Sequence, residues 1–366
     1  GLGDVYKRQL YTVDLATGQL TEIGDFANNN IISLLTIPKA KAADGAPAAI
    51  DQMHFDFVDG SLSGHIQFTA PSKNFAGGNL TDSKLTYTIL NNKEEIAKGG
   101  TKPGAAVSQP VTLNKGYNTI TIIVSNGEGP SPKFASRYYA GFDTPKPVVN
   151  AHTSVDTNTG KATVTWEAPA GGQNEGYVGE LTYNIKRYPE GKVIKTGHVG
   201  TMFEDTLPEG ETAVYGYGIT PNNHGTMGEE MVSNYVSYGA PITPPFANGF
   251  ESEADLAYFK VIDADNDGIT WGIEEPGMFN DNDGYARILR GEEKHSFDDW
   301  LVSPALHVKA NHQYKISFRL SGRYKYYEEQ FEVKYGTAPT PEAMTKTLMP
   351  QTMTVSYTHL TLPTTS

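Results

Sequence analysis

Apolar and polar residues alternate along most of this chain, which is the pattern of β-strands with one face in a core and the other in water. Residues 162–166 alternate Ala, Val and Trp with two threonines. Residues 181–186 alternate Leu, Tyr and Ile with Thr, Asn and Lys. The pattern predicts an all-β chain with few helices, in which Trp166 and Tyr183 face a core.

The chain also repeats itself. Phe68 and Trp166 stand in similar segments 98 residues apart, and Tyr87 and Tyr183 stand in similar segments 96 residues apart. A repeat of about 100 residues is too long for a solenoid unit and matches a whole immunoglobulin-like sandwich used twice. We therefore expect these four aromatic side chains in the cores of two consecutive sandwiches.

Both copies resemble fibronectin type III domains. The resemblance is carried by the Trp166 strand, which ends in Ala168-Pro169, by the Tyr183 strand, and by the late segment that runs into Pro-Asn-Asn-His-Gly at 221–225. It implies two sandwiches, at residues 50–143 and 144–243, whose default role is to hold other modules apart.

Two segments precede the sandwiches. Residues 10–26 predict two short strands joined by a turn at 16–18. Their pattern resembles a β-propeller blade, so that residues 10–36 are either a remnant of such a blade or a stray hairpin packed on the next domain. Residues 37–49, rich in Ala, Pro and Lys, predict a linker.

The two ends of the chain resemble foreign sequence. Residues 4–9, Asp-Val-Tyr-Lys-Arg-Gln, resemble a translated sequencing adapter, and residues 355–360, Val-Ser-Tyr-Thr-His-Leu, resemble its reverse complement. We therefore set residues 1–9 and 355–366 aside in predicting the fold, and expect the genuine protein to continue in both directions.

The charge and composition exclude several classes of partner. The net charge is −13, and no cluster of Lys and Arg suited to phosphates is present, so we expect no nucleic-acid partner. The chain has no cysteine, which leaves stability to the β cores and to a metal ion. No apolar stretch approaches the length of a membrane span. Separately, we expect the chain to be a monomer.

An acidic loop carries the most specific chemistry. Asp263, Asp265 and Asp267 alternate, Gly268 follows, and Glu274 stands at the twelfth position from Asp263. Oxygen ligands at the first, third and fifth positions, a tight turn and a late carboxylate are what Ca²⁺ requires. Because Pro and Gly at 276–277 stop any helix, we expect a structural calcium turn within a β-sandwich rather than an EF-hand; an acidic surface turn without metal is the alternative.

The third module, residues 246–354, resembles the choice-of-anchor J or cleaved-adhesin family. The matching segments are Gly-Phe-Glu-Ser-Glu at 249–253, the acidic loop, Trp271, and Asp-Trp-Leu-Val-Ser-Pro at 299–304. The resemblance implies a jelly-roll sandwich of a secreted bacterial adhesin, here truncated. It also implies calcium ligands among the early acidic residues, with Glu251 added to the three aspartates.

Aromatic residues of this module are candidates for ligand contact. Trp300 is expected in the core, with a glycan-stacking platform as the alternative. A basic aromatic cluster on a loop is the best surface candidate, although a solvated hairpin tip has the same composition. Its members are Arg323, Tyr324, Lys325, Tyr326 and Tyr327, of which the arginine and the three tyrosines are the candidate contacts.

The sequence therefore predicts tandem immunoglobulin-like sandwiches followed by a truncated jelly roll. We expect a non-catalytic extracellular or cell-surface protein that binds a glycan or protein ligand. The alternative is a set of accessory domains from a secreted peptidase or glycoside hydrolase whose catalytic part lies elsewhere. Catalysis in this chain is disfavoured because neither His-Glu-x-x-His, Gly-x-Ser-x-Gly nor a phosphate loop occurs, and adjacent carboxylates such as Asp298 and Asp299 point to different faces.

Overall fold

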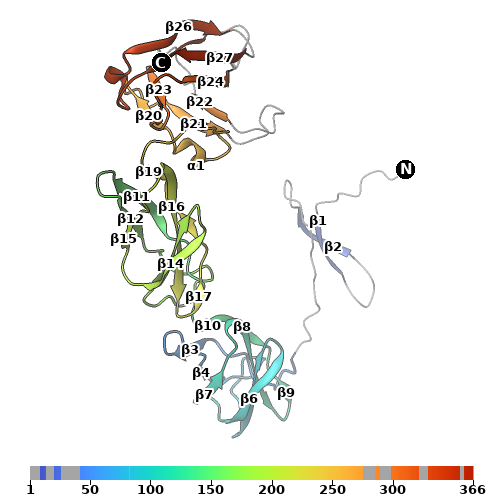
Figure 1. Cartoon of the computed structure of the whole chain (residues 1–366). Helices are drawn as coiled ribbons and strands as arrows, with labels where there is room; N and C mark the ends of the chain where they lie inside the picture. The colour runs from blue at the N-terminus through green and yellow to red at the C-terminus, as the bar shows by residue number, and fades with distance from the viewer. Residues whose placement is uncertain are drawn as a thin grey trace.

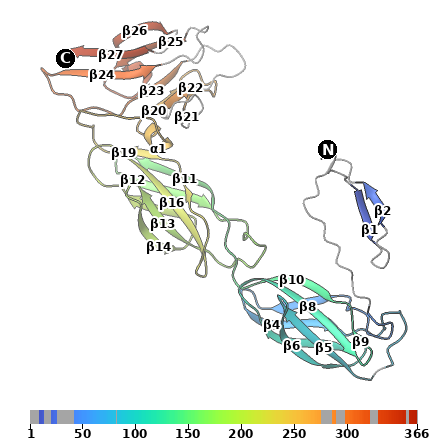
Figure 2. The ribbon, with the colours of Figure 1, turned by 90° about the vertical axis from the view of Figure 1, so that its right-hand side faces the viewer.

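The computed structural model of the chain describes residues 9–13, 20–25, 42–81, 83–274, 285–288, 298–320, 329–354 and 358–365. Strands dominate these residues, and the helical elements among them are one turn of helix, α1 (Glu253–Leu256), and a short 3₁₀ turn, η1 (Pro341–Ala343). Two sandwiches and a third β module follow one another end to end in both views (Figures 1 and 2). The all-β prediction is confirmed.

At the N-terminal end, β1 (Gln9–Val13) and β2 (Leu20–Asp25) pair in antiparallel fashion. This pairing confirms the two predicted strands, and the turn predicted at 16–18 lies outside the described residues. Its origin as a propeller blade stays a prediction.

The first sandwich consists of a three-stranded sheet in the order β3-β4-β7 and a second sheet in the order β10-β8-β5-β6, with β9 beside β8. All its strand pairs are antiparallel. The strands are β3 (Met53–Phe57), β4 (Ser63–Thr69), β5 (Leu85–Asn91), β6 (Glu94–Thr101), β7 (Ala106–Thr112), β8 (Gly116–Asn126), β9 (Gly129–Pro130) and β10 (Phe134–Ala140).

The second sandwich repeats this arrangement, with one sheet in the order β11-β12-β15 and another in the order β14-β13-β16, where three short strands pair with β16. In both sandwiches the first, second and fifth strands form one sheet, and the remaining strands form the other; this is the strand order of a fibronectin type III-like sandwich. The strands are β11 (Val149–Asp156), β12 (Lys161–Glu167), β13 (Thr182–Tyr188), β14 (Lys192–His198), β15 (Met202–Thr206), β16 (Ala213–Asn223), β17 (Thr226–Met227), β18 (Met231–Val232) and β19 (Val236–Tyr238).

The core of each sandwich contains the predicted aromatic pair. Phe68 on β4 contacts Tyr87 on β5 edge to face, with ring centroids 5.4 Å apart. Trp166 on β12 contacts Tyr183 on β13 in the same way at 5.1 Å. All four side chains are buried, because the inner faces of the two sheets meet at these alternate positions. The prediction of core aromatics at repeated positions is confirmed.

Part of the predicted linker belongs to the first sandwich. Ala46 is fully buried, and backbone hydrogen bonds join Ala48 N to Lys73 O (2.9 Å) and Phe75 N to Ala46 O (2.7 Å). Asn126 Nδ2 donates to Gly45 O as well. Residues 43–49 are therefore attached to the sandwich, and their Ala- and Pro-rich composition does not make them a free linker.

The third module is built from antiparallel pairs: β20 with β23, β21 with β22, β24 with β27, and β25 with β26. Residues 314–320 and 331–335 lie on β24 and β25, whereas closure into a jelly roll stays a prediction. The strands are β20 (Lys260–Asp263), β21 (Trp271–Glu274), β22 (Tyr285–Ile288), β23 (Asp299–Val302), β24 (Gln313–Leu320), β25 (Glu329–Tyr335), β26 (Lys346–Thr354) and β27 (Thr358–Thr365).

Strand β27 lies in one of the two end segments that were set aside. Residues 355–366 were set aside as foreign sequence, yet Thr358–Thr365 pairs with β24 over its whole length. A Thr- and Leu-rich segment has high β-propensity, and an adjacent unpaired strand edge is a ready template for it. The segment therefore takes part in the fold of this chain whatever its origin.

Candidate metal centre

The acidic loop connects two strands of the third module. Strand β20 ends at Asp263, β21 begins at Trp271, and no helix flanks the loop on either side among the described residues. Asn266 and Gly268 take left-handed backbone conformations, with φ of 58° and 80°. Asn tolerates this region and Gly adopts it without strain, so these residues let the chain turn tightly enough to bring its aspartates together. The loop therefore joins two strands and not two helices, and calcium binding stays a prediction.

The loop brings Asp263, Asp265 and Asp267 into one cluster. One carboxylate oxygen from each lies within 4.8 Å of the others. Asp263 and Asp267 are half-buried, and Asp265 is exposed. The alternate positions of these residues, folded around a tight turn, place three negative charges on the same side of the loop.

Backbone N–H groups hold the cluster in shape. Gly268 N donates to Asp263 Oδ2 (2.9 Å), and Asp267 N donates to Asp263 Oδ1 (3.2 Å). Ile269 N donates to Asp267 Oδ1 at 2.7 Å. Burial alone would raise the pKa of Asp263, but these N–H donors outweigh it and hold the pKa below its ordinary value. Asp263 is therefore ionised at neutral pH.

A fourth carboxylate, Asp299 on β23, lies near the cluster, although it is not one of the three residues whose oxygens lie within 4.8 Å of one another. In the β20–β23 ladder Asp299 lies directly opposite Asp263, and Ala264 N donates to Asp298 O (3.0 Å) just beyond that pair. Asp298 N in turn donates to Asp265 Oδ2 at 3.3 Å. The acidic loop is thus fastened to the start of β23, 36 positions along the chain from Asp263 to Asp299.

The environment of Asp299 is unusual for a carboxylate. Both of its side-chain oxygens are buried and have no hydrogen-bond partner among the described residues. Burial raises its pKa; the Thr270 hydroxyl works in the opposite direction, and the negative charges of Asp265, Asp263 and Asp267 raise it further. A buried carboxylate surrounded by like charges is costly unless a cation or a proton neutralises it.

These four residues fit a hard divalent cation. Ca²⁺ takes six to eight oxygen ligands from carboxylates, carbonyls and water, in a flexible geometry. The cluster supplies carboxylate oxygens from a preformed loop, and Asp299 supplies two more that lack a partner among the described residues. Sequence reasoning missed Asp299 as a ligand candidate because only the strand register brings it opposite Asp263, and no local spacing signals that register.

Two tryptophans flank the cluster. Trp271 Nε1 donates to Asp299 O (3.3 Å), and Trp300 Nε1 donates to Asp298 Oδ1 (2.8 Å). Trp300 is half-buried, and the Lys334 ammonium lies 5.5 Å from the centre of its ring. Trp300 is therefore only half-buried and does not take the expected core position, and its indole N–H bonds a side chain that is exposed.

The remaining predicted ligands are placed elsewhere or lie outside the description. Glu251 is exposed beside α1; its Oε1 lies against Gly249, its backbone N donates to Asp255 Oδ2 (2.9 Å), and it is not a member of the three-aspartate cluster. The backbone of Glu274 ends β21, opposite Tyr285, and its side chain lies outside the described part. The aromatic cluster lies outside the described residues as well, at Arg323, Tyr324, Tyr326 and Tyr327.

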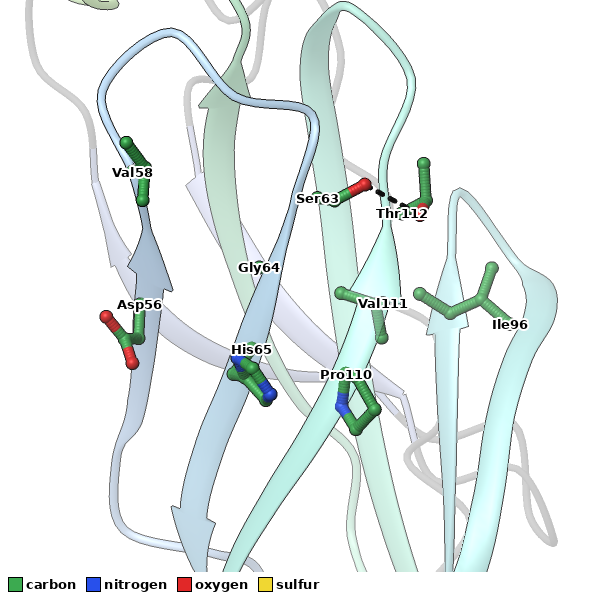
Figure 3. Close-up of a pocket in the computed structure, with 9 residues that line it drawn as sticks. All are labelled: Asp56, Val58, Ser63, Gly64, His65, Ile96, Pro110, Val111 and Thr112. Carbon is green, nitrogen blue, oxygen red and sulfur yellow. Dashed lines mark hydrogen bonds between the residues drawn. The ribbon is translucent and has the colours of Figure 1, made fainter.

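A shallow depression of about 620 Å³ lies on the first sandwich, between β3, β4, β7 and β6 (Figure 3). Ser63 and Thr112 share a hydrogen bond of 3.0 Å along its wall. Asp56 lies opposite His65 in the ladder, yet its carboxylate accepts from Gln67 Nε2 (3.0 Å) and points away from the imidazole in Figure 3. This arrangement does not orient His65 as a general base.

Among the described residues, no helix has the length and apolar character needed to cross a membrane. No protein-family model matches the chain, and no curated protein matches it. Among solved structures, the crystal structure of chicken CNTN1 FN1-FN3 domains is similar, with 12% sequence identity and a TM-score of 0.25. The match covers 74% of this chain and 92% of that one. The assignment of the two sandwiches accordingly depends on their own strand order and cores.

Proposed function

We propose that this chain is a non-catalytic extracellular protein in which two fibronectin type III-like sandwiches act as spacers and the third module binds a glycan or protein ligand. In this proposal the third module is a member of the choice-of-anchor J or cleaved-adhesin class. Two closed sandwiches in series suit a spacer, because each buries its own core and offers its ends to the next module.

Calcium has a structural role in the proposal. Asp263, Asp265, Asp267 and Asp299 would hold the ion, which would neutralise their charges and tie the acidic loop to β23. The single observation that carries this assignment is the pair of buried oxygens of Asp299, unpartnered among the described residues, beside three other carboxylates. The cysteine-free chain has no disulfide to perform the same task.

Isothermal titration of the chelator-treated chain with CaCl₂ tests the assignment. We expect saturable binding, a higher melting temperature with calcium than with chelator, and weaker binding by Asp265→Ala. Asp56→Ala is the matched control, because it removes an exposed negative charge from the first sandwich. Equal binding by the wild type and Asp265→Ala, or no binding by a folded wild type, would contradict the calcium assignment.

The second candidate is a set of accessory domains of a secreted peptidase or glycoside hydrolase. Both candidates predict no turnover by this chain, and the neighbouring sequence of the gene would separate them. Hydrolysis of casein or of a polysaccharide by the purified chain would overturn both. Binding of the calcium-loaded chain to a glycan array or to matrix proteins, lost on deletion of residues 246–366, would support the ligand-binding role of the third module.

A further inference from the structure

The connector between the two sandwiches is short and is held by both of them. Strand β10 ends at Ala140 and β11 begins at Val149, so residues 141–148 make the whole connection. Phe142 and Pro145 form bridges to Tyr177 and Gly172 of the loop between β12 and β13. These two bridges hold the connector against a loop of the second sandwich.

Asp143 is the centre of this attachment. It is fully buried, and its carboxylate accepts four hydrogen bonds, from Thr144 N (2.7 Å), Asn174 N (2.8 Å), Asn174 Nδ2 (2.9 Å) and Gly176 N (3.0 Å). Burial alone would raise its pKa, but these donors outweigh burial and hold the pKa below its ordinary value. Three of the four donors belong to the loop of the second sandwich, so a connector side chain orders that loop.

The backbone of Asp143 is fixed as firmly as its side chain. Asp143 N donates to Tyr177 O (2.9 Å), and Asp143 O accepts from Asn223 Nδ2 (2.8 Å). Asn223 is fully buried at the end of β16 and also bonds Tyr177 O and Gly179 N. Two segments of the second sandwich, the loop that contains Tyr177 and the end of β16, therefore hydrogen-bond to the backbone of the same connector residue.

The first sandwich contacts the same region of the second. Tyr117 OH on β8 donates to Asn174 O (2.8 Å), which places a side chain of the first sandwich on the loop that holds Asp143. Tyr139 on β10 packs so closely on Gly176 that a Cβ there would overlap its ring. Tyr117 and Tyr139 also meet edge to face at 5.2 Å. These contacts resist rotation of one sandwich about the connector.

An aromatic stack closes the other side of the connector. The ring of Phe142 stacks on His224 of the second sandwich, with centroids 4.2 Å apart and planes 16° from parallel. The far end of that ring lies against Gly60, in the turn between β3 and β4, where a Cβ would lie 2.6 Å from Phe142 Cζ. Phe142 is thus inserted between the two sandwiches, and bending in this direction is blocked.

We propose that these contacts make the two sandwiches one stiff rod, in which Asp143 locks the connector and no hinge operates between β10 and β11. Buried hydrogen bonds on one side and aromatic packing on the other define a single orientation. Such a rod would keep the third module at a fixed distance from the N-terminal segment. This biological role rests on the proposed spacer function. The stiffness itself does not depend on any ligand.

Spin labelling of the full chain tests this inference, because the absence of native cysteine allows two labels to be introduced cleanly. The exposed residues Lys98 and Lys195, one on each sandwich, are replaced by cysteine and spin-labelled. The distribution of distances between the two labels is measured by pulsed electron–electron double resonance in the presence of chelator. A variant with Gly-Ser-Gly inserted after Gly141 serves as the reference, because its connector is flexible and its distance distribution should be broad. The chelator separates this test from the calcium assignment.

We expect a single narrow distribution for the wild type and one at least twofold broader for Asp143→Ala. Asp156→Ala is the matched control, because Asp156 also accepts local hydrogen bonds but lies at the end of β11, away from the connector. A wild-type distribution as broad as that of the insertion would overturn the rigid joint, and a narrow distribution for folded Asp143→Ala would overturn the role of Asp143. If Asp143→Ala does not fold, the double variant Tyr117→Phe, Phe142→Ala replaces it, and a narrow distribution there overturns the proposal.

Discussion

Replacing Asp299 by asparagine separates a metal site from an ordinary acidic turn, because the two predict opposite effects on stability. Without metal, the wild type keeps a buried carboxylate that has no partner among the described residues, which costs about 1–3 kcal/mol, opposite Asp263 in the ladder. Like charges directly opposite each other add about 0.2–1 kcal/mol. The substitution Asp299→Asn removes the charge while keeping the shape, so we expect it to raise the free energy of unfolding in chelator by about 1 kcal/mol.

With calcium the order reverses. At a free calcium concentration of about 100 times Kd, binding stabilises the wild type by about 2.7 kcal/mol. A tenfold loss of affinity in the variant removes about 1.4 kcal/mol of this gain. On the usual scale for a domain of about 100 residues, each kcal/mol shifts the melting temperature by about 4–8 °C. In chelator the variant is therefore expected to melt about 4–8 °C higher than the wild type. In calcium the loss of about 1.4 kcal/mol outweighs the gain of about 1 kcal/mol by about 0.4 kcal/mol, so the variant is expected to melt about 2–3 °C lower.

Tryptophan fluorescence can follow both unfolding transitions and so measure this reversal in the order of melting temperatures. Trp271 bonds the backbone of Asp299 and Trp300 bonds Asp298, so two of the three tryptophans are next to the site. Thermal melts of both proteins, with chelator and with calcium, give the four midpoints required. A variant that melts lower than the wild type in chelator and keeps the full calcium response would refute the reasoning, since Asp299 would then be a structural acceptor and not a ligand.

Three further outcomes follow from the sandwiches. Trp166→Ala should lower the free energy of unfolding of the second sandwich by about 3–5 kcal/mol in urea melts, whereas Thr165→Ala on the outer face should change it by less than about 0.5 kcal/mol. Gly176→Ala should broaden the inter-sandwich distance distribution, because its Cβ overlaps Tyr139. Since the folded pKa of Asp143 is depressed, its contribution is complete above the unfolded pKa of about 3.9 and is lost as the pH falls through the lower folded value; melts in acid should show a smaller loss for Asp143→Asn than for the wild type.

The cores could be predicted from the sequence because they obey a local rule. Side-chain direction alternates along every strand, so the alternation at 162–166 and the repeat of Phe68 as Trp166 already determine which residues are buried. The acidic loop obeys a local rule as well: alternate aspartates before Gly268 predicted the cluster that forms. In both cases the interacting residues are near in sequence or repeat at a fixed spacing.

No such local rule determines the positions of three other residues, Asp299, Asp143 and Trp300. The position of Asp299 depends on the register of β23 against β20, and a shift by one residue would point its side chain to the other face. Asp143 meets its donors only because the loop at 171–177 folds over the connector. Trp300 follows a pattern typical of core strands but lies in a two-stranded ladder, which cannot cover both of its faces. Tertiary context decides each of these positions.

The contrast between the two buried carboxylates bears on the metal assignment. A carboxylate removed from water is stabilised by N–H donors, by a cation, or by a proton. Asp143 has four N–H donors and a lowered pKa, so it remains an anion without a metal. Asp299 has no hydrogen bond of normal geometry among the described residues. The nearby Thr270 hydroxyl lowers its pKa, yet burial and the neighbouring charges still leave the pKa raised, so the cation and the proton remain. Because the ionised Asp263 and its two neighbours contribute further negative charge at the same place, one divalent cation satisfies all four groups at neutral pH, whereas a proton on Asp299 would leave the other three repelling one another.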